Sequence, residues 1–424
     1  MASSTEELKI KGQAAKAASR KLARLPGDVK NRALHNIADA LVAKAMEIIE
    51  ENMKDYKEGQ DAGMSAAMLD RLMLDPSRIS AMAQDVRTVE ALPDPLSEVF
   101  DMRFLPNGMQ VGKKRVPLGV IGAIYESRPN VTVDISVLCL KSGSAVILRG
   151  GKEAIHSNKA LAHLVQEASY KAGIPEGAVQ LIESTDRAMV DQMLKMRDTI
   201  DLLVPRGGAP FIKYVAENAA MPVVAGGIGV CHTYVDKSAD INKAIAIAYN
   251  AKVQRPTVCN ALDTLLVHKD IAAGYLPAIA QEWAKAGVEM HCDKRALDIV
   301  KSVTGARAIA ATPEDWGKEF LALIAAVKVV DSLDEALDHI EEYTSGHSEA
   351  IVTENYSAAM RFLNEVDAAC VYANASTRFT DGGQLGLGAE VGISTQKFHA
   401  RGPLGLKEIT SYKWIILGNG HVRP

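Results

Sequence analysis

The spacing of apolar residues between positions 116 and 236 constrains the fold of this chain more than any other feature. Short apolar runs, each long enough for one strand, alternate there with longer stretches of helical composition. The runs cover residues 120–125, 145–148, 179–182, 202–204 and 223–224, and the helical stretches include 152–172 and 186–196. Strands that alternate with helices of this length form right-handed βαβ units. The segment is therefore predicted to form a parallel sheet covered by helices.

A second alternation of the same kind runs from residue 240 to about residue 364. A helix is expected first, and strands then follow at 264–268, 327–330 and 350–353 with helical sequence between them. The length of 424 residues allows two or three domains. The fold class predicted from both alternations is α/β, with two parallel-sheet lobes.

Residues 5 to about 90 are predicted to be helical throughout. Alanine, leucine, lysine and glutamate dominate this stretch, and apolar residues such as Ala33 and Ile37 recur at helical spacing. A break is expected at residues 25–28, with Asp28 as the N-cap of the next helix. These helices are interpreted as a layer that covers another part of the protein.

A β-hairpin is predicted near residue 107. The tripeptide Pro106-Asn107-Gly108 separates two strand-like runs, and an Asn-Gly pair favours a tight turn between strands. The C-terminal tail is glycine-rich and then strand-like at 412–417. Because a hairpin of this kind does not need to pack on its own domain, it is interpreted as an arm that reaches toward a partner subunit.

Charge and composition exclude several classes of function. With 48 basic and 52 acidic residues the net charge is −4, so no basic surplus predicts a nucleic-acid partner. The apolar run 116–125 is about half the length that a membrane span needs, and the first ten residues lack the apolar core of a secretion signal. Five scattered cysteines without a C-x-x-C pair favour a reducing compartment, and the expected location is cytoplasmic. His291-Cys292 has no second ligand pair, so no metal site is predicted.

Cys259 is the strongest candidate for a reactive side chain. It lies in the sequence QRPTVCNA, where Pro256 ends a helical segment and a strand follows, so the thiol is expected on a short loop. Lys252 and Arg255 are close in sequence, and neighbouring cations favour the thiolate. The local sequence is equally compatible with an inert buried cysteine.

Two glycine turns follow predicted strands and suit an anion. Arg206-Gly207-Gly208 leads into a helix, and a helix N-terminus offers free backbone N–H groups and a partial positive charge. Arg149 and Lys152 flank a second glycine pair at the end of another strand. Ligands of open α/β sheets bind at this edge. Neither turn matches a standard nucleotide fingerprint, and glycine is common in any turn between a strand and a helix.

Two further segments carry groups that suit an anionic substrate. Asn130 offers an amide donor for an oxyanion, and Arg128 offers a fork of donors for a carboxylate or phosphate. The alternative is that Pro129-Asn130 only shapes a turn and caps a helix. Ser376, Thr377 and Arg378 lie in a loop that is interpreted either as closing over an anion or as a mobile surface loop.

The chain resembles one known family in six segments along its length. In order, these read YESRPNVTVD, VILRGGKEA, LVPRGG, NAKVQRPTVCNA, HSEAIVTEN and NASTRFTDGGQLGLGAEVGISTQKFHARGPLGL. They resemble the γ-glutamyl phosphate reductases, also called glutamate-5-semialdehyde dehydrogenases, of the aldehyde-dehydrogenase-like superfamily. The resemblance spans nearly the whole chain, from the N-terminal helices to Trp414. It implies a cofactor domain, a catalytic domain with the cysteine, and a β-arm for oligomerisation.

The resemblance also implies an activity. This is the NADPH-dependent reduction of L-glutamyl 5-phosphate to L-glutamate 5-semialdehyde with release of phosphate, the second step of proline biosynthesis. The thiolate of Cys259 would attack the acyl carbonyl and form a thioester. The amide of Asn130 and the backbone N–H of Cys259 would hold the oxyanion.

The other site residues follow from the resemblance together with the turns described above. The residues expected to bind NADP are Arg149, Gly151, Lys152, Arg206, Gly207 and Gly208. The residues expected to bind the substrate are Arg128, Ser376, Thr377 and Arg378. Arg149 and Lys152 are expected to meet the 2′-phosphate of NADPH.

One departure from the wider superfamily indicates the fate of the thioester. Hydrolytic aldehyde dehydrogenases carry a glutamate in an E-L-G-G motif that activates water. The corresponding residues here read Val224-Ala225-Gly226-Gly227, without an acid. Attack by water on the thioester should therefore be slow, which favours a reductase that uses phosphate.

The resemblance also suggests how the chain is divided. The expected cofactor-binding domain comprises residues 1–102 and 118–236, with 366–400 returning to the active-site cleft. The expected catalytic domain comprises 237–365, and the expected oligomerisation arm comprises 103–117 and 401–424. A homo-oligomer is expected, and the lability of the acyl phosphate favours transient contact with glutamate 5-kinase.

Three rival functions make different predictions. An aldehyde dehydrogenase that acylates coenzyme A would form its thioester from aldehyde and free coenzyme A, without a need for phosphate. A cysteine hydrolase or acyltransferase, using Cys259 with a histidine such as His399, would need no nicotinamide. A non-catalytic binding protein would tolerate replacement of Cys259.

Overall fold

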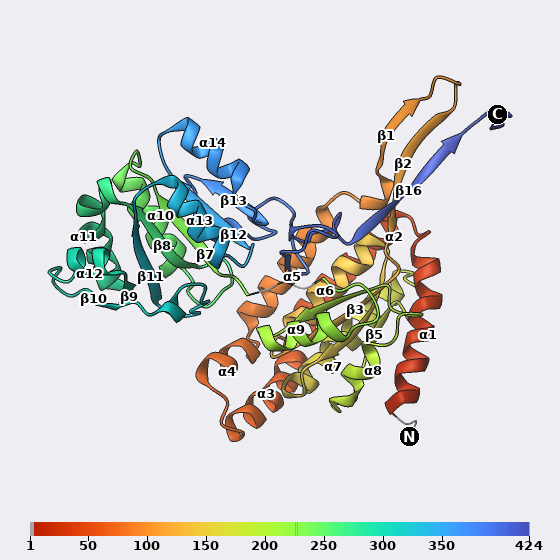
Figure 1. Cartoon of the computed structure of the whole chain (residues 1–424). Coiled ribbons are helices and arrows are strands. Elements are labelled where there is room, and N and C mark those ends of the chain that lie inside the picture. The colour runs from red at the N-terminus through yellow and green to blue at the C-terminus, as the bar shows by residue number, and fades with distance from the viewer. Residues whose placement is uncertain (1–3, 225, 227, 424) are drawn as a thin grey trace. The chain divides into compact units, whose positions relative to one another are not determined.

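The computed structural model describes residues 4–224, 226 and 228–423, and the chain divides into two compact units (Figure 1). Unit 1 comprises Met1–Ala225, Gly386–Gly392 and Pro403–Pro424, and unit 2 comprises Gly226–Leu385 and Ile393–Gly402. Each unit contains its own parallel sheet with helices packed on it. The predicted α/β class with two parallel-sheet lobes is therefore confirmed.

Unit 1 contains the N-terminal helices, a parallel sheet and an antiparallel arm. Its helices are α1 (Ser4–Leu22), α2 (Gly27–Ala43), α3 (Ala45–Asp61), α4 (Ala66–Leu72), α5 (Pro76–Ala91), α6 (Asn130–Ser142), α7 (Ile155–Lys171), α8 (Ala188–Met193) and α9 (Ala209–Asn218). Its strands are β1 (Val99–Phe104), β2 (Gln110–Pro117), β3 (Val120–Tyr125), β4 (Ala145–Gly150), β5 (Val179–Leu181), β6 (Leu202–Arg206) and β16 (Thr410–Leu417).

The parallel sheet of unit 1 has the strand order β5-β4-β3-β6. Four of the predicted strands correspond to these, whereas the fifth is reduced to a single bridge between Val223 and Leu203. One face of the sheet packs against α1, α8 and α9 through a cluster that includes Leu8, Met193 and Val215. The other face is covered by α6 and α7, and α2, α3 and α5 pack over these helices. The sheet is thus buried on both faces, which explains its continuous apolar strands.

The N-terminal region is helical, as predicted, but the predicted cap at Asp28 is wrong. Helix α2 begins at Gly27, and its N-cap is Pro26, which makes no side-chain capping bond. Pro26 already has the extended conformation of an N-cap residue, with φ −60° and ψ 152°. Asp28 therefore lies in the first turn, where its carboxylate faces the positive end of the helix dipole.

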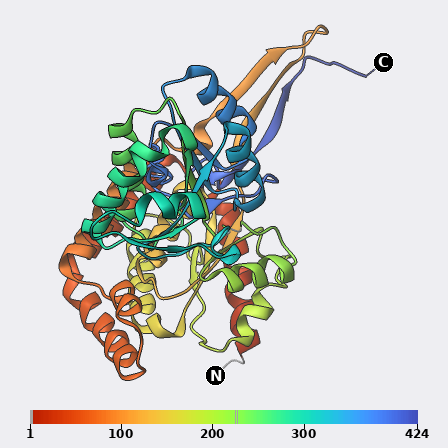
Figure 2. The same ribbon diagram turned by 60° about the vertical axis from the view of Figure 1, so that its left-hand side comes forward.

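The predicted hairpin and the predicted C-terminal strand form one three-stranded antiparallel sheet. Its order is β1-β2-β16, and β16 pairs with β2 along its whole length, from Thr410 opposite Pro117 to Leu417 opposite Gln110. Both views show this arm projecting from the rest of unit 1 (Figures 1 and 2). Trp414 and Ile416 on β16 are about half exposed, and this strand lies at an edge of the sheet.

Unit 2 is built around a seven-stranded parallel sheet with the order β10-β9-β11-β8-β7-β12-β13. Its strands are β7 (Cys231–Val235), β8 (Leu262–His268), β9 (Glu289–Cys292), β10 (Arg307–Ala310), β11 (Ile324–Val330), β12 (Ser348–Val352) and β13 (Cys370–Ala373). Its helices are α10 (Ile241–Val253), α11 (Lys269–Ala286), α12 (Lys294–Val300), α13 (Leu333–Tyr343) and α14 (Tyr356–Glu365). Two short strands follow along the chain, β14 (Ile393–Ser394) and β15 (Gly402–Pro403).

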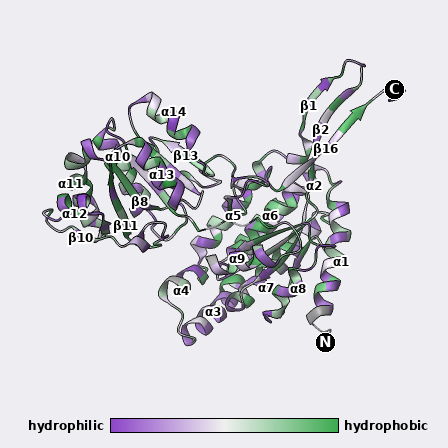
Figure 3. Cartoon of the chain, viewed as in Figure 1, coloured by the Kyte–Doolittle hydropathy of each residue, from purple (hydrophilic) through white to green (hydrophobic). Residues whose placement is uncertain are grey.

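The core of unit 2 lies on both faces of this sheet. Helices α10, α11 and α12 cover one face through a cluster that includes Ala248 and the fully buried Trp283. Helices α13 and α14 cover the other face through Ile340 and Phe362. Hydropathy colouring shows the central strands of this sheet as largely hydrophobic (Figure 3).

Strand β7 was not among the strands predicted from apolar runs, although the sequence beside Cys231 is strand-like, and it affects how the chain is divided. Its residues include His232 and Thr233, whose buried polar side chains interrupt the apolar pattern. Because β7 pairs with β8 and β12, it belongs to unit 2. The compact units therefore divide at residue 225, before the domain boundary expected at 236. They also place most of 366–400 in unit 2. Among the described residues, none of the helices has the length and hydropathy that a membrane crossing requires.

Candidate active site

Cys259 lies on the connection between α10 and β8. Helix α10 ends at Val253 and β8 begins at Leu262, so the expected order of helix, short loop and strand is confirmed. The cysteine is half-buried in a turn of this loop. The loop precedes its strand, and it therefore meets the amino end of the sheet, where β7 and β12 also begin.

The start of β7 approaches the backbone of Cys259 closely. A Cβ atom added to Gly229 would lie only 1.8 Å from the carbonyl oxygen of Cys259. The thiol of Cys231 donates a hydrogen bond to the same carbonyl oxygen, at 3.2 Å. Gly229 thus leaves room for the backbone of the cysteine loop, and the buried thiol of Cys231 stabilises that backbone with a hydrogen bond. Burial raises the pKa of Cys231 well above its usual value, so its proton stays in place.

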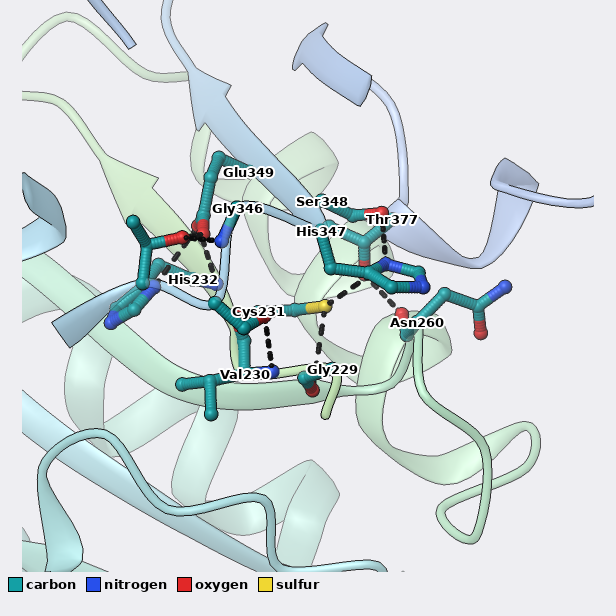
Figure 4. A network of polar contacts seen from close by, with 12 residues as sticks. Gly229, Val230, Cys231, His232, Asn260, Gly346, His347, Ser348, Glu349 and Thr377 are labelled. Atoms are coloured by element: carbon teal, nitrogen blue, oxygen red, sulfur yellow. Dashed lines mark hydrogen bonds and ion pairs between the residues drawn. The ribbon is translucent and has the colours of Figure 1, made fainter. Parts of the chain in front are cut away.

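A chain of polar groups continues from Cys231 along the start of β12 (Figure 4). The sulfur of Cys231 lies 3.9 Å from His347 Nδ1, which lies 2.8 Å from the hydroxyl of Ser348. That hydroxyl is 2.6 Å from Thr380 Oγ1, which in turn is 2.8 Å from the hydroxyl of Tyr372. Burial lowers the pKa of His347 to about 4, so the ring is neutral at pH 7. The chain links the cysteine loop to the segment around residue 380 without a buried charge.

Asn260 contacts the second predicted loop directly. Its Nδ2 donates to the carbonyl oxygens of Thr380, at 2.8 Å, and Arg378, at 3.4 Å. Thr377 Oγ1 donates to the backbone oxygen of Asn260 at 2.7 Å. The structure therefore brings Cys259 and the residues Ser376–Arg378 into one site within unit 2.

The two hydroxyls predicted to bind substrate are engaged within the protein. Ser376 is buried and its Oγ accepts the backbone N–H of Arg378, while the buried Thr377 donates to Asn260. Arg378 is half-buried, with Nε bonded to Gln254 Oε1 at 2.8 Å and Nη1 bonded to Asn260 Oδ1. Burial, followed by the nearby charge of Arg255, lowers the pKa of Arg378, and Cys259 opposes this shift. Of the three residues, Arg378 is the one whose charge acts on the cysteine.

A buried ion pair lies beside this site. Lys252 Nζ is 3.6 Å from Asp263 Oδ1, and both side chains are almost completely buried. Burial raises the pKa of Asp263 to about 6, although Lys252 opposes the shift. Burial likewise lowers the pKa of Lys252. The lysine expected from sequence to favour the thiolate is thus held mainly by Asp263 and by the carbonyl oxygen of Ala322, which accepts from it at 3.2 Å.

The predicted site residues of unit 1 lie at the opposite, carboxyl edge of its sheet. Strands β3, β4 and β6 end there, at Tyr125, Gly150 and Arg206. The exposed turn of Gly207 and Gly208 leads into α9, as predicted.

Two carboxylates occupy positions at this edge that suit an anion. The N–H of Gly208 points to Glu126 Oε2 at 3.4 Å. Glu153 Oε1 accepts the backbone N–H and the hydroxyl of Ser127, at 2.6 and 2.8 Å. Ser127 has a φ of +40°, which is uncommon for a residue other than glycine. The edge is thus rich in donors aimed at negative charge.

Asn130 is the first residue of α6, and its side chain is already oriented. Its Nδ2 donates to Asp134 Oδ2, one helical turn away, at 2.8 Å. Burial raises the pKa of Asp134 to about 7, and the nearby Asp85 adds to this, while Asn130 and Arg206 oppose it. Of the pair Pro129-Asn130, it is Pro129 that occupies the N-cap position of α6, without a side-chain capping bond, so the Asn130 amide itself does not cap the helix.

The cations predicted to meet the cofactor have different surroundings. Arg149 is only 8% exposed, and its Nη2 is directed toward the carbonyl oxygens of Thr185 and Asp186, at 3.4 and 3.5 Å. Burial lowers its pKa. Lys152 is exposed, Gly151 is buried and Arg128 is half-buried. Lys152 is therefore better placed than Arg149 to meet a phosphate that arrives from solvent.

Several residues of the site were not singled out from sequence. Asn260 and Asp134 lay within segments used for the family resemblance, without a role of their own. His347 belongs to HSEAIVTEN, and its place in that segment was the available signal. His399, considered for a hydrolase, is exposed in the segment 393–402. Within the described part of the chain, no group of three or more His, Cys, Asp or Glu side chains has the arrangement of a metal site.

The fold and a cysteine on the loop before a strand define the class of protein. A model of the aldehyde dehydrogenase family matches residues 1–300 and 314–415. The chain therefore belongs to the aldehyde dehydrogenase family, which makes it an oxidoreductase.

Individual relatives place the chain more narrowly. A curated protein of Dehalococcoides mccartyi (strain 195), named γ-glutamyl phosphate reductase, is 63% identical over 417 residues, which cover 98% of each chain. A protein of the same name from Caldanaerobacter subterraneus is 56% identical over 420 residues, covering 98% of this chain and 100% of the relative. The crystal structure of γ-glutamyl phosphate reductase from Thermotoga maritima matches with a TM-score of 0.95 and 47% identity, covering 99% and 100% of the two chains. Within the family, the chain is thus one of the γ-glutamyl phosphate reductases.

Proposed function

We propose that this protein reduces L-glutamyl 5-phosphate to L-glutamate 5-semialdehyde with NADPH and releases phosphate, as the second step of proline biosynthesis. The observation that carries the proposal is that Arg378 is bonded to Asn260, the residue directly after Cys259, so that the cysteine loop and the arginine share one site of unit 2. An acyl phosphate needs a nucleophile for its carbonyl and a cation for its negative charge. The names of the relatives supply the same substrate independently.

The cysteine provides the covalent step. The thiolate of Cys259 attacks the acyl carbonyl, the bond from carbon to phosphate oxygen breaks, and phosphate leaves and takes a proton from solvent. The product is a thioester between the glutamyl chain and Cys259. When bound, the nicotinamide supplies the hydride that reduces this thioester, after which the aldehyde leaves and the thiolate is restored.

The oxyanion of the tetrahedral intermediate needs oriented donors. We assign this role to the amide of Asn130 and the backbone N–H of Cys259, from the motifs shared with the family. The bond from Asn130 Nδ2 to Asp134 supports the assignment, because it fixes which end of the amide carries the donors. A donor fixed in advance loses no free energy to reorientation during the reaction.

Arg378 is proposed to bind the anionic substrate, and Arg128 to bind a second anionic group. Two nitrogen atoms of Arg378 are already held by Gln254 and Asn260, so the third, Nη2, is assigned to the substrate. A guanidinium with a fixed plane matches a phosphate or carboxylate better than a flexible ammonium does. Ser376 and Thr377 would then act indirectly, because their hydrogen bonds hold the backbone of the segment that carries Arg378.

The carboxyl edge of unit 1 fits a dinucleotide phosphate. A Cβ atom on Gly207 would lie 2.7 Å from Glu126 Oε2 and 2.9 Å from Phe211 Cδ1, so a side chain here would displace these neighbours, whereas glycine leaves the turn open. The N-terminus of α9 adds backbone donors and a partial positive charge. We propose that Gly207, Gly208 and Lys152 hold the phosphates of NADPH, with Arg206 near them. Arg149 and Gly151 are buried, and they would stabilise the backbone of the turn that follows β4.

The fate of the thioester follows from the sequence. The stretch Val224-Ala225-Gly226-Gly227 lacks the glutamate that activates water in hydrolytic members, and residues 225 and 227 lie outside the described residues. Reduction is therefore proposed as the fate of the thioester.

The arm is proposed to join subunits into a homo-oligomer. Strand β16 lies at an edge of its sheet, and Tyr412, Trp414 and Ile416 follow one another at every second position along it, each about half exposed or more. Exposed edges of this kind pair readily with another chain.

The proposal is tested by running the reaction backward, because the acyl phosphate is labile. Wild-type protein given glutamate 5-semialdehyde, NADP and inorganic phosphate should form reduced nicotinamide. Cys259→Ala should reduce the rate by at least about 10³-fold, since it removes the covalent step. Cys292→Ala is the matched control, because this thiol is buried in β9 and has no part in the mechanism. No signal from the wild type, or signal with free coenzyme A in place of phosphate, would overturn the proposal.

A further inference from the structure

We propose that Asn260 is a positioning residue, which sets the orientation of Arg378 and so determines how the site receives the phosphate of its substrate. The inference rests on the proposed function for the identity of that anion. It concerns the residue next to the cysteine, whose own side chain is bonded to a segment more than a hundred positions later. We call residues 376–380 the anion segment.

The side chain of Asn260 is used completely by the anion segment. Its amide nitrogen donates to the carbonyl oxygens of Thr380 and Arg378, at 2.8 and 3.4 Å, and its oxygen accepts from Arg378 Nη1. The residue is only 4% exposed, so water does not substitute for these bonds. One small side chain thus holds both the backbone and the guanidinium of the arginine.

The backbone of Asn260 adds a bond in the opposite direction. Thr377 Oγ1 donates to the carbonyl oxygen of Asn260 at 2.7 Å, and Thr377 is fully buried. The close view includes this bond between Thr377 and Asn260 (Figure 4). The loop of Cys259 and the anion segment are therefore joined in both directions at this residue.

The guanidinium of Arg378 makes a second hydrogen bond to a side chain, and this bond restrains it less. Gln254 Oε1 accepts from Arg378 Nε at 2.8 Å, but Gln254 is exposed. A bond to an exposed amide competes with water and restrains the guanidinium less than a buried one does. Asn260 is therefore the residue that fixes the plane of the guanidinium.

A positioning role predicts a specific pattern in the kinetics. Without Asn260, the guanidinium of Arg378 is free to rotate, and the loss falls on binding of phosphate in the reverse reaction. A charge-assisted hydrogen bond supports a change of about 10- to 100-fold. A purely structural role would instead lower the amount of folded protein and leave KM unchanged.

The experiment is a double-mutant cycle with inorganic phosphate as the varied substrate. Asn260→Ala should raise the KM for phosphate by about 10- to 100-fold, and Arg378→Ala should raise it at least as much. In the Arg378→Ala background, Asn260→Ala should have almost no further effect, because the residue acts through the arginine. Additive effects of the two substitutions, or an unchanged KM in Asn260→Ala, would overturn the proposal.

A matched control distinguishes the predicted effect of Asn260→Ala on the KM for phosphate from the general effect of removing a buried asparagine. Asn52 is fully buried in α3 of unit 1 and makes a similar set of bonds, to Leu72, Leu74 and Ser157. Asn52→Ala should lower the thermal midpoint without changing the KM for phosphate. If Asn260→Ala does not fold, Asn260→Asp decides the question in the same cycle. It keeps the shape of the side chain, but it places negative charge against the two carbonyl oxygens.

A separate readout distinguishes this inference from the proposed function. Phosphate bound beside Cys259 should slow alkylation of its thiol by iodoacetamide, which requires no turnover. The phosphate concentration that gives half protection should rise by the same 10- to 100-fold in Asn260→Ala. If the wild type is protected by phosphate but forms no reduced nicotinamide, the proposed reaction fails while the role of Asn260 stands. Equal protection of both proteins would reject the role of Asn260.

Discussion

The two units place their candidate chemistry at opposite edges of parallel sheets. In unit 1 the loops with Glu126, Lys152 and Gly207 follow the carboxyl ends of their strands. In unit 2 the loop with Cys259 precedes β8, and Cys231 and Ser348 are the first residues of β7 and β12. One unit thus follows the general rule for ligands of open α/β sheets, and the other reverses it.

The difference shows how each edge obtains its electrostatic field. At a carboxyl edge, helices begin, so backbone N–H groups and positive dipole ends are available to an anion. At an amino edge, helices end, and their dipoles carry negative charge. Cys259 follows the C-terminal end of α10, so side chains must supply the positive charge that a thiolate needs. This explains why unit 2 uses the side chain of Arg378, whereas unit 1 uses glycine turns.

The largest of the following effects is expected for the oxyanion, for which unit 1 offers the side chain of Asn130 rather than backbone N–H groups. Asn130→Ala should lower kcat by about 10²- to 10³-fold, which is the usual result of removing one oxyanion donor. The KM for the nicotinamide should stay close to that of the wild type. Steady-state kinetics of the reverse reaction measure both values. A kcat within threefold of the wild type would contradict the role of Asn130.

The next prediction tests the close contact between Gly229 and the backbone of Cys259 at the amino edge of the unit 2 sheet. Gly229→Ala places a Cβ atom 1.8 Å from the carbonyl oxygen of Cys259, so the cysteine loop must move. A displacement of about 1 Å in a reacting group costs about 10²-fold in rate. Gly274→Ala in α11 is the control, because its nearest neighbour would be 3.9 Å away and alanine favours a helix. Equal rates in the two variants would show that the loop adapts.

The two units should also respond differently to acid. Burial lowers the pKa of His339 to about 3 and that of His347 to about 4, so unit 2 favours their neutral forms and loses stability as the pH falls below about 6.5. His232 and Lys328 face His339 and add to its shift. Asp263, raised to about 6, offsets one of the two histidines. Between pH 6 and pH 4 the two histidines outweigh Asp263, so the free energy of unfolding of unit 2 should fall.

Unit 1 has the opposite sign. The pKa of Asp134 is raised to about 7, above its value of 3.8 in the unfolded chain, so its contribution to stability grows as the pH falls from 7 toward 4. Hydrogen exchange at pH 7 and pH 5 checks both signs. Protection should fall in β8 and β12 and be maintained in β3 and β4. An equal loss of protection in both sheets would refute the comparison.

The smallest effect concerns an exposed side chain at the carboxyl edge. Lys152→Ala should raise the KM for NADPH by no more than about fivefold, because exposed charge pairs contribute up to about 1 kcal/mol. The KM for NADH should not change, since NADH lacks the 2′-phosphate. Lys213→Ala in α9 serves as a control with an equally exposed lysine. If Lys152→Ala lowered kcat/KM for NADPH by more than Asn130→Ala does, the carboxyl edge of unit 1 would depend on side chains rather than on its backbone.

The fold was largely predictable because its signals are local. Apolar runs such as 120–125 are continuous, since the strands are buried on both faces. Strand β7 was not among the predicted strands because His232 and Thr233 interrupt its apolar pattern. The buried ring of His232 is accommodated by Glu349, whose Oε2 lies 3.0 Å from His232 Nδ1, a contact that local sequence does not reveal.

The site was predictable only where residue type alone indicates chemistry. Cys259 and the glycine turns were candidates because a thiol can act as a nucleophile and a glycine turn before a helix can bind an anion, and the family resemblance then selected them. Asn260 was not a candidate, because its partners lie 117 to 120 positions later in the chain, and no local pattern gives that distance. The inward orientation of Arg149 depends on the loop after β5, which sequence spacing does not describe.

The pairing of β16 with β2 sets the order in which the molecule is finished. The two strands are separated by about three hundred residues, and the whole of the unit 2 sheet lies between them in the sequence. Because synthesis proceeds from the N-terminus, β1 and β2 are made long before their third strand. The edge of β2 must therefore stay unpaired while the unit 2 sheet is synthesised. The return of the chain from unit 2 is thus the event that completes the arm.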